Sequence, residues 1–453
     1  MSNLTKSPSS SLKPASVGAL NDAPFPRPIV AWGIVAAFFV AYIFSFIDRM
    51  IIGLLVESIK ADLKLSDTQI GLLQGFAFAL FYTVAGIPIG RLIDRAPRMK
   101  IVAAGIFVWS IMTAICAGVT NFWQFFIARM GVGVGEAVLS PAAYSVISDS
   151  FPKGRLGLPM GVYGLGSAMG AGLAFMLGAV VVALVANADA TVLPILGEVK
   201  AWQVAFLVAG LPGLLIAALF LFLPEPKRRF TEAEANDKSP VPMSAVMDHM
   251  RENKVFFWCL FLAVGMVNLS VLGSISWLPA MLMRTFGMEL AAAGYLSGAM
   301  LIIGGLIGLI GGGALMDRIG GGTPQVRLRF CGWSAAIGSI GALTFPLTDS
   351  IPLLAVSFIL FFSAAAVAVG AAPSTIQQLA PNRMRATISA AYVFVINAVG
   401  LGAGPTLTAM IGDNFFAFES GIRYAIAIVA VSGYIVGAIL FFIAARNVEK
   451  HAH

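Results

Sequence analysis

Four charged residues interrupt segments that are otherwise apolar: Asp48 and Arg49 lie in one segment, Arg129 and Glu136 in another. Burying a charge at the centre of a bilayer costs about 2.5 to 3.5 kcal/mol even on the insertion scale, so such residues need partners and by default mark function. A buried carboxylate beside an arginine changes its proton affinity when water or a ligand reaches it. These residue types predict a site that takes up protons and whose arginines can bind an anion.

The spacing of the four charges predicts how they pair. Arg129 and Glu136 are seven positions apart, which places them on one helix face, about 10 Å apart along the axis. Asp48 and Arg129 lie at similar depth in their segments, so we expect an ion pair between them. Glu136 lies deeper, within reach of Arg49, whose side chain points about 100° away from that of Asp48. The alternative is a network that only ties two helices together, although desolvation makes it a poor source of stability.

Hydrophobicity predicts the elements that hold these charges. The chain is 58% hydrophobic and 11% charged, against about a quarter charged in soluble domains. An apolar run of about 20 residues can cross a bilayer as a helix. We place such spans at residues 30–56, 67–90, 100–119, 122–148, 158–185, 202–223, 254–283, 290–316, 328–347, 350–376, 384–411 and 422–445. The sequence predicts an all-α membrane protein with twelve transmembrane helices.

A repeat and one long polar segment divide these helices into two sets of six. The set Gly90, Asp94 and Arg95 after the second span recurs 223 positions later as Gly313, Asp317 and Arg318 after the eighth. We predict two six-helix bundles at residues 29–223 and 254–446, a cytoplasmic linker at 224–253, a disordered cytoplasmic tail at 1–28 and a cytoplasmic tail at 447–453. Parallel repeats of this kind are typical of transporters whose site lies between the two halves.

The distribution of basic residues predicts the orientation in the membrane. With both termini inside, most Lys and Arg residues fall in the tails and the even-numbered loops. Five fall in the outer loops: Lys60, Lys64, Lys200, Arg284 and Arg423. The positive-inside rule therefore predicts a multi-pass protein of the plasma (inner) membrane with both termini in the cytoplasm. Residues 1–28 lack the apolar stretch of a signal peptide.

The doubled loop motif predicts a gate on the cytoplasmic side. We assign gating to Gly90, Asp94, Arg95, Arg98, Gly313, Asp317 and Arg318. A carboxylate at Asp94 or Asp317 can accept hydrogen bonds from a neighbouring helix N-terminus, and the arginines can fasten the adjoining loop. The alternative is ordinary basic charge after a helix. The doubled motif and the twelve-span plan resemble the major facilitator superfamily along nearly the whole chain after residue 28.

Three segments of the first half resemble the Spinster family of lysolipid and sphingosine-phosphate carriers: Phe46–Arg49, Gly71–Gly75 and Arg129–Ala137. The resemblance implies a proton-linked carrier of amphipathic anionic lipids that works by alternating access. It implies that Asp48 is the proton-sensitive carboxylate and that Arg49 and Glu136 lie near the polar headgroup. Proton coupling is accordingly expected at Asp48, Arg129 and Glu136.

Substrate contacts are expected from both halves. Besides Arg49, Arg129 and Glu136, six residues are expected to line the cavity: Phe76, Tyr82, Asn268, Trp277, Tyr392 and Asn397. The alternative for each aromatic residue is a lipid-facing or packed position, which periodicity cannot separate from a cavity wall. The second half has no comparable charge inside its spans, so we expect it to supply shape and apolar surface.

Other classes of protein fit the sequence less well. The three cysteines and three histidines are not at metal-ligand spacing, and the glycines from Gly131 to Gly135 lie inside a span rather than after a strand. We expect no enzyme, metal, cofactor or nucleic-acid partner. The expected partners are a lipid-like or small-molecule substrate, protons and membrane lipids, and the chain is expected to be a monomer. Alternative cargoes are a small organic anion, such as a sugar acid, or a drug; a channel is a further alternative.

Overall fold

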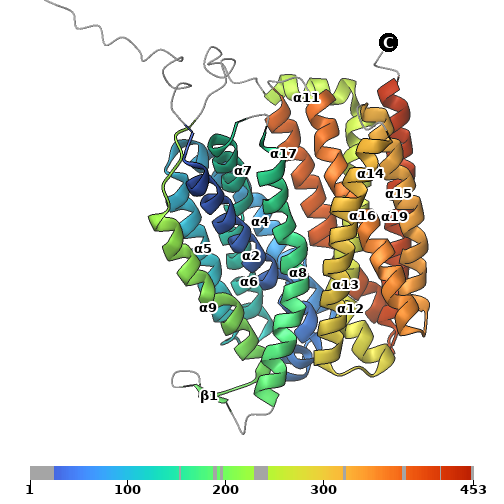
Figure 1. Cartoon of the computed structure of the whole chain (residues 1–453). Helices are drawn as coiled ribbons and strands as arrows, with labels where there is room; N and C mark the ends of the chain where they lie inside the picture. The colour runs from blue at the N-terminus through green and yellow to red at the C-terminus, as the bar shows by residue number, and fades with distance from the viewer. Residues whose placement is uncertain are drawn as a thin grey trace, which may run out of the picture.

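Twelve helices in the computed structural model are long and apolar enough to cross a membrane. The structure describes residues 25–152, 155–186, 191–193, 197–228, 243–319, 323–379, 384–418 and 420–449. Figure 1 shows the helices side by side in two bundles, with a small β-hairpin projecting from one end. The predicted all-α membrane fold is confirmed.

The first bundle forms six spans from eight helical segments. They are α2 (Pro28–Leu63), α3 (Asp67–Gln74), α4 (Phe76–Arg95), α5 (Arg98–Cys116), α6 (Phe122–Glu136), α7 (Leu139–Ser150), α8 (Gly157–Ala186) and α9 (Ala201–Phe222). The strands β1 (Thr191–Leu193) and β2 (Gly197–Val199) pair antiparallel between α8 and α9. Helix α2 packs on α8, and α5 packs on α6 and α9.

The second bundle includes two short π-helical stretches inside its spans. Its segments are α12 (Lys254–Phe286), α13 (Leu290–Leu306), η2 (Ile307–Gly311), α14 (Gly312–Arg318), α15 (Pro324–Leu347), α16 (Ile351–Leu379), α17 (Arg385–Ile396), η3 (Asn397–Ala403), α18 (Gly404–Phe415) and α19 (Ile422–Glu449). A further helix, α11 (Met243–Glu252), lies in the segment predicted as a linker.

Three differences from the predicted spans affect the site. Helix α2 continues to Leu63, seven residues beyond the predicted end, because its polar last turns enter a charged network described below. The second span is broken at Gly75 and the fourth after Glu136. A Cβ atom at Gly75 would lie 2.8 Å from the carbonyl oxygens of Leu401 and Gly402, so the break lets two backbones approach closely.

The two bundles touch at the end of the molecule that carries the β-hairpin, which we call the hairpin end; the opposite end, with the first and last described residues, is the termini end (Figure 1). Contacts between the bundles join α2 to α12, α3 to α18, α4 to η3 and α8 to α13. A Cβ atom at Gly71 would lie 2.9 Å from the carbonyl oxygen of Pro405. The backbones of the two bundles are therefore packed together at the hairpin end.

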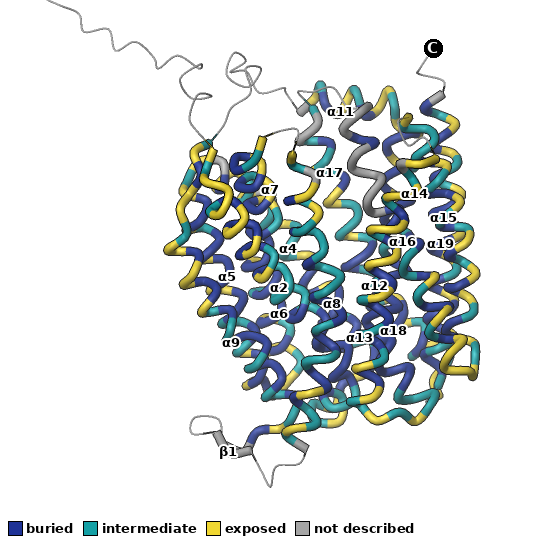
Figure 2. The backbone as a smooth tube through the Cα atoms, viewed as in Figure 1, coloured by how far each residue is buried: buried dark blue, intermediate teal, exposed yellow. Residues whose placement is uncertain are grey.

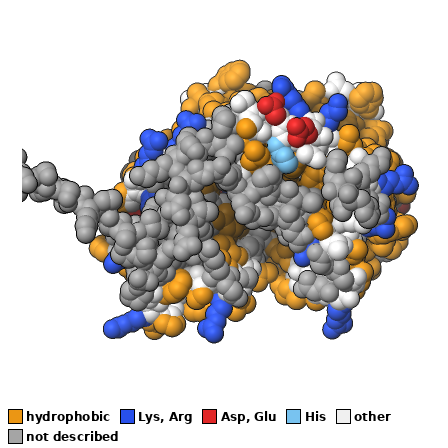
Figure 3. Space-filling view, turned by 90° about the horizontal axis from the view of Figure 1, so that it is seen from above, with side chains coloured by type: hydrophobic (Ala, Val, Ile, Leu, Met, Phe, Trp, Pro, Cys, Tyr) orange, Lys and Arg blue, Asp and Glu red, His pale blue; other side chains and the backbone are white. Residues whose placement is uncertain are grey.

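Burial follows the same arrangement. Figure 2 shows buried residues along the inside of both bundles and exposed residues on their outer surfaces. One buried apolar cluster includes Ile51, Leu54 and Phe175 of the first bundle with Leu278 and Leu301 of the second. Seen from the termini end, Lys and Arg side chains lie around the edge and a hollow is visible near the middle (Figure 3).

Candidate functional site

The first ion pair of the candidate site joins α2 to α6. Nη1 of Arg129 lies 3.5 Å from Oδ1 of Asp48 and donates a 3.3 Å hydrogen bond to the backbone carbonyl of Asp48. The hydroxyl of Thr113, on α5, donates to Oδ2 of Asp48. All three side chains are buried. The predicted contact between Asp48 and Arg129 is present, and three helices hold the carboxylate.

A second ion pair lies one residue along α2. Nε of Arg49 donates a 2.6 Å hydrogen bond to Oε2 of Glu136, and the hydroxyl of Ser45 donates to the same oxygen. Ser45 and Arg49 are four residues apart on α2, so they share one helix face and reach the carboxylate together. Asp48 and Arg49 therefore serve different partners, as the sequence predicts.

Arg49 is also surrounded by aromatic rings. Its Cζ atom lies 5.0 Å from the ring centroid of Phe46, 4.7 Å from that of Phe78 and 4.9 Å from that of Tyr82. The Arg49 side chain keeps 11% of its surface exposed, whereas that of Glu136 keeps none. Aromatic faces attract a guanidinium group. They therefore hold Arg49 in place while leaving one edge accessible.

Several polar atoms of this site have no hydrogen-bond partner among the described residues. They are Oδ1 of Asp48, Nε and Nη2 of Arg129, and Oε1 of Glu136. An unsatisfied buried polar group costs about 1 to 3 kcal/mol, and more when it is charged. Each carboxylate thus has one oxygen that accepts no hydrogen bond from the described residues and on which a proton can bind.

The six predicted cavity residues fall into three groups. Phe76 is exposed; Tyr82, Asn268 and Asn397 are partly exposed. Tyr392 is buried and its ring packs 5.7 Å from that of Phe261. Trp277 is fully buried and its indole N–H donates a 3.0 Å hydrogen bond to the carbonyl of Pro405. Trp277 therefore packs α12 on α18 and has no surface free for a ligand in this conformation.

Among the predicted gating residues whose side chains are described, Arg98 is the one that is fully buried. It pairs with Asp149 at the end of α7. Its Nε and its backbone N–H both donate to Oε1 of Glu225, which follows α9. Arg228 donates in turn to the carbonyls of Ile93 and Ala96, at 2.6 and 2.8 Å. This network ties the first loop motif to the segment that leaves the first bundle.

The remaining gating residues lie at helix ends. Gly90 and Arg95 are in the last turns of α4, and Gly313 and Arg318 occupy the same positions in α14. Both arginines are exposed. The side chains of Asp94 and Asp317 lie outside the described part of the chain, so their predicted hydrogen bonds to helix N-termini stay predictions.

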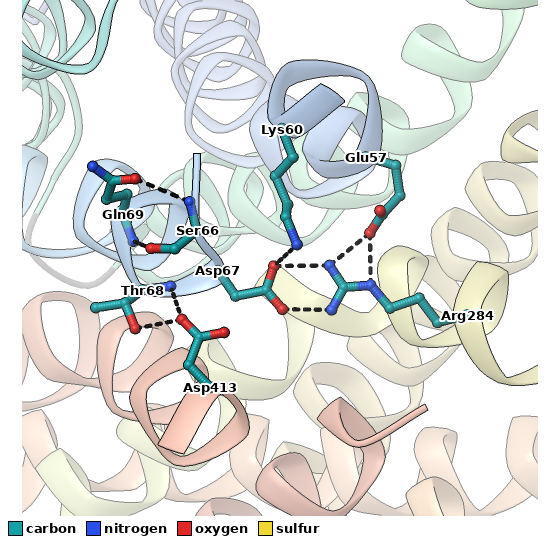
Figure 4. A network of polar contacts seen from close by, with 8 residues as sticks. All are labelled: Glu57, Lys60, Ser66, Asp67, Thr68, Gln69, Arg284 and Asp413. Carbon is teal, nitrogen blue, oxygen red and sulfur yellow. Dashed lines mark hydrogen bonds and ion pairs between the residues drawn. The ribbon is translucent and has the colours of Figure 1, made fainter. Parts of the chain in front are cut away.

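A second charged network closes the hairpin end (Figure 4). Arg284, in the last turn of α12, donates to both carboxylate oxygens of Asp67, with Nη2 to Oδ1 at 2.9 Å, and to Oε1 of Glu57 at 2.7 Å. Lys60 also pairs with Asp67. Beside this cluster, the backbone N–H and the hydroxyl of Thr68 donate to Oδ2 of Asp413, at 2.8 and 2.7 Å.

Sequence reasoning missed the hydroxyl partners and this second network. Ser45 stands four residues before Arg49, a spacing that could have indicated a shared face. Thr113 comes from a different helix and carries no such signal. Lys60 and Arg284 were assigned only to outer-loop charge, because the prediction ended the first span at residue 56 and the seventh at residue 283, whereas α2 continues to Leu63 and α12 to Phe286.

Two six-span bundles, joined at one end and carrying buried charges in the first, define the class of membrane transporters that alternate between two faces. The sequence model of the family described as "Major Facilitator Superfamily" matches residues 38–405 of this chain. The chain belongs to this superfamily. It is therefore a transporter and not an enzyme.

Individual relatives include transporters with different cargoes. An "MFS-type efflux pump" of Mycolicibacterium smegmatis is 28% identical to this chain, and the alignment covers 93% of this chain and 94% of the pump. A "Probable L-galactonate transporter" of Escherichia coli is 26% identical over 73% of each chain. The "Sphingosine-1-phosphate transporter SPNS2" of Danio rerio is 30% identical over 44% of this chain and 37% of its own.

A solved structure supports the fold. A bacterial homologue of the human lysosomal transporter Spinster, in an inward-facing and unoccupied conformation, superposes with a TM-score of 0.76 at 24% identity. The match covers 94% of this chain and 99% of that one. The similar sequences also include "Protein spinster homolog 1" of Xenopus laevis, 24% identical over 92% of this chain and 81% of the homologue, so the predicted resemblance to the Spinster family is confirmed.

Proposed function

We propose that this chain is a proton-coupled secondary active transporter that moves an amphipathic anionic lipid, of the lysophospholipid or sphingosine-phosphate type, by alternating access. The observation that carries the proposal is the double ion pair of the first bundle. Asp48 and Glu136 each hold an arginine and each keep one oxygen without a hydrogen-bond partner among the described residues. Charges in this setting are costly unless they act in binding or coupling.

The geometry suggests how anion binding and proton binding support each other. Arg49 is the partly accessible member of its pair, so an anionic headgroup can approach its guanidinium. If an anionic headgroup pairs with Arg49, the buried Glu136 carboxylate loses its counter-charge. An uncompensated buried carboxylate is strongly unfavourable, and protonation removes the charge. Binding of the anion therefore favours binding of a proton at Glu136. The ion pair of Asp48 and Arg129 lies next to this position on the same two helices.

The lipid-like cargo is supported by the surroundings of Arg49. Three aromatic rings lie within 5.0 Å of its Cζ atom, and the second bundle buries no charged side chain among its described residues. Relatives named as Spinster homologues and a sphingosine-1-phosphate transporter point the same way. The second candidate is a small organic anion or a drug, favoured by the relatives named as galactonate, hexuronate and efflux transporters.

The test is uptake of labelled lysophosphatidylglycerol into proteoliposomes, with and without an imposed pH gradient. We expect the gradient to drive uptake by the native chain and Asp48→Asn to abolish the gradient dependence. Asp349→Asn is the matched control, because it makes the same change in a carboxylate that is 87% exposed and pairs only with Arg423 among the described contacts. L-Galactonate is assayed in parallel. Uptake of L-galactonate but not of lysophosphatidylglycerol would show that the cargo is a sugar acid and not a lipid. If neither compound is taken up, both proposed cargoes are wrong.

The orientation is part of the proposal. With the termini end in the cytoplasm of a plasma membrane, protons and substrate would enter from the hairpin end when that end opens. The basic side chains around the termini end (Figure 3) support this orientation under the positive-inside rule. Accessibility of single cysteines to an impermeant reagent in whole cells tests it.

A further inference from the structure

Arg284 depends on the other bundle for its counter-charges. It belongs to α12 of the second bundle, whereas both of its carboxylate partners, Glu57 on α2 and Asp67 on α3, belong to the first. The Arg284 side chain is 10% exposed, and two of its nitrogens reach Asp67 while Glu57 receives a further bond (Figure 4). Among the described residues, the guanidinium is thus neutralised only through contacts that cross between the bundles.

Opening of the hairpin end would change the charges of the two bundles unequally. Asp67 would keep Lys60, since both lie in the first bundle. Arg284 would lose Glu57 and Asp67 together. Asp413 of the second bundle, which lies beside this cluster, accepts hydrogen bonds from Thr68 instead of from Arg284 (Figure 4). Opening therefore leaves Arg284 unpaired in the second bundle and Glu57 unpaired in the first, and the Arg284 side chain is the less exposed of the two, at 10% against 34%.

One contact of Arg284 would survive opening. Its Cζ atom lies 5.8 Å from the ring centroid of Trp277, which is on the same helix. Trp277 is in turn fixed by its hydrogen bond to Pro405 of the same bundle. An indole face attracts a guanidinium and restricts where it can point. Arg284 would thus be held at the mouth of the open hairpin end rather than turn freely into solvent.

We propose that Arg284 is an anion-binding residue of the conformation that is open at the hairpin end, and that the ligand is the carboxylate or phosphate group of the substrate. The inference rests on the proposed alternating access. A guanidinium binds such groups through two parallel hydrogen bonds, as it binds Asp67 here. Closing the hairpin end returns Asp67 to Arg284 and displaces the anion inward, toward Arg49. Asp67 and the substrate are therefore competitors for one guanidinium.

The competition predicts opposite effects for two variants that break the same contact. The test measures the distance between spin labels at Lys64→Cys and Asn414→Cys, two exposed positions at the hairpin end, in nanodiscs titrated with short-chain lysophosphatidylglycerol. We expect the anion to lengthen the distance in the native chain and the matching neutral monoacylglycerol not to. Arg284→Gln should raise the half-saturating concentration about tenfold, the loss of one charged hydrogen-bond partner. Asp67→Asn should lower it, because the competing carboxylate is gone.

Two results would overturn this assignment. If Arg284→Gln and Asp67→Asn shift the half-saturating concentration equally, Arg284 only closes the hairpin end. If the native chain responds equally to the anionic and the neutral lipid, no anion is bound there. Asp413→Ala is the control, since it removes the acceptor of the two Thr68 hydrogen bonds and should change the open population without changing the anion specificity. Asp48→Asn separates the two proposals: it should lose pH-driven uptake while keeping the response that depends on Arg284.

Discussion

The two bundles bury different kinds of side chain. Among the described residues, the buried charged side chains are all in the first bundle: Asp48, Asp67, Arg98, Arg129, Glu136 and Asp149. The described part of the second bundle buries hydroxyl groups such as Ser270, Ser274 and Thr408, and its spans contain the π-helical stretches η2 and η3. Such stretches occur frequently at functional positions in helices. The buried charges are thus held in one bundle, whereas the π-helical stretches come from the other, and η3 packs on α4 of the first bundle.

The largest effect is expected from leaving a charge of the first bundle unpaired. Arg129→Met removes the only cation within 4 Å of the Asp48 carboxylate among the described contacts. We expect the free energy of unfolding to fall by about 3 to 5 kcal/mol. Adding Asp48→Asn should recover most of this stability without restoring transport. Thermal unfolding of the purified protein measures the first effect and proteoliposome uptake the second.

The matched change in the second bundle is Ser274→Ala, which removes a buried hydroxyl without a hydrogen-bond partner among the described residues. It should change stability little, because no satisfied bond is lost. Equal losses of stability for Arg129→Met and Ser274→Ala would break the contrast between the bundles.

A smaller effect is expected where the bundles touch. Gly75→Ala places a Cβ atom 2.8 Å from the carbonyl oxygens of Leu401 and Gly402, whereas a Cβ atom at Gly86 on the same helix meets nothing within 4 Å. Overpacking of this kind costs about 1 to 3 kcal/mol. Gly75→Ala should therefore shift the population toward the open hairpin end. The distance between the spin labels at positions 64 and 414 measures this shift in population. Gly86→Ala is the control and should leave the distance unchanged. An equal shift for both variants would show that helix propensity, and not the contact with η3, is responsible.

The smallest effect concerns the aromatic rings around Arg49. Tyr82→Leu removes one ring at 4.9 Å from the Arg49 Cζ atom, a contact of about 0.5 to 2 kcal/mol, or roughly two- to thirtyfold in affinity for lysophosphatidylglycerol. Tyr82→Phe keeps the ring and should change less. Asn268→Ala in the second bundle should change affinity by less than either, as measured by equilibrium binding. A larger loss for Asn268→Ala would assign headgroup recognition to the second bundle.

The number of spans and the main ion pairs could be predicted because both follow from the cost of polar groups in lipid. Apolar runs have to be helices, and charges inside them have to find partners. With so few charges available, Asp48 and Arg129 were natural partners. The hydroxyls of Ser45 and Thr113 could not be ranked above other small polar residues, since a neutral hydroxyl in a helix can be satisfied by its own backbone.

The helix breaks and the role of Trp277 could not be predicted from local sequence. Gly75 interrupts the second span because the carbonyls of η3 lie against it, and nothing near Gly75 in the sequence encodes η3. Trp277 was expected at a cavity wall, and it is buried against α18 instead. Aromatic residues serve both purposes, and only their neighbours in space decide which.

The sequence by itself determined the class of protein, the twelve spans, the division into two bundles and the four charges that need partners, because hydrophobic length and buried charge act locally. The tertiary structure decided which end is closed, which carboxylates hold Arg284, and which glycines bring the bundles together. These depend on contacts between segments more than 200 residues apart, such as Asp67 with Arg284. Such contacts stabilise the protein only when the folded chain brings the two segments within hydrogen-bonding distance.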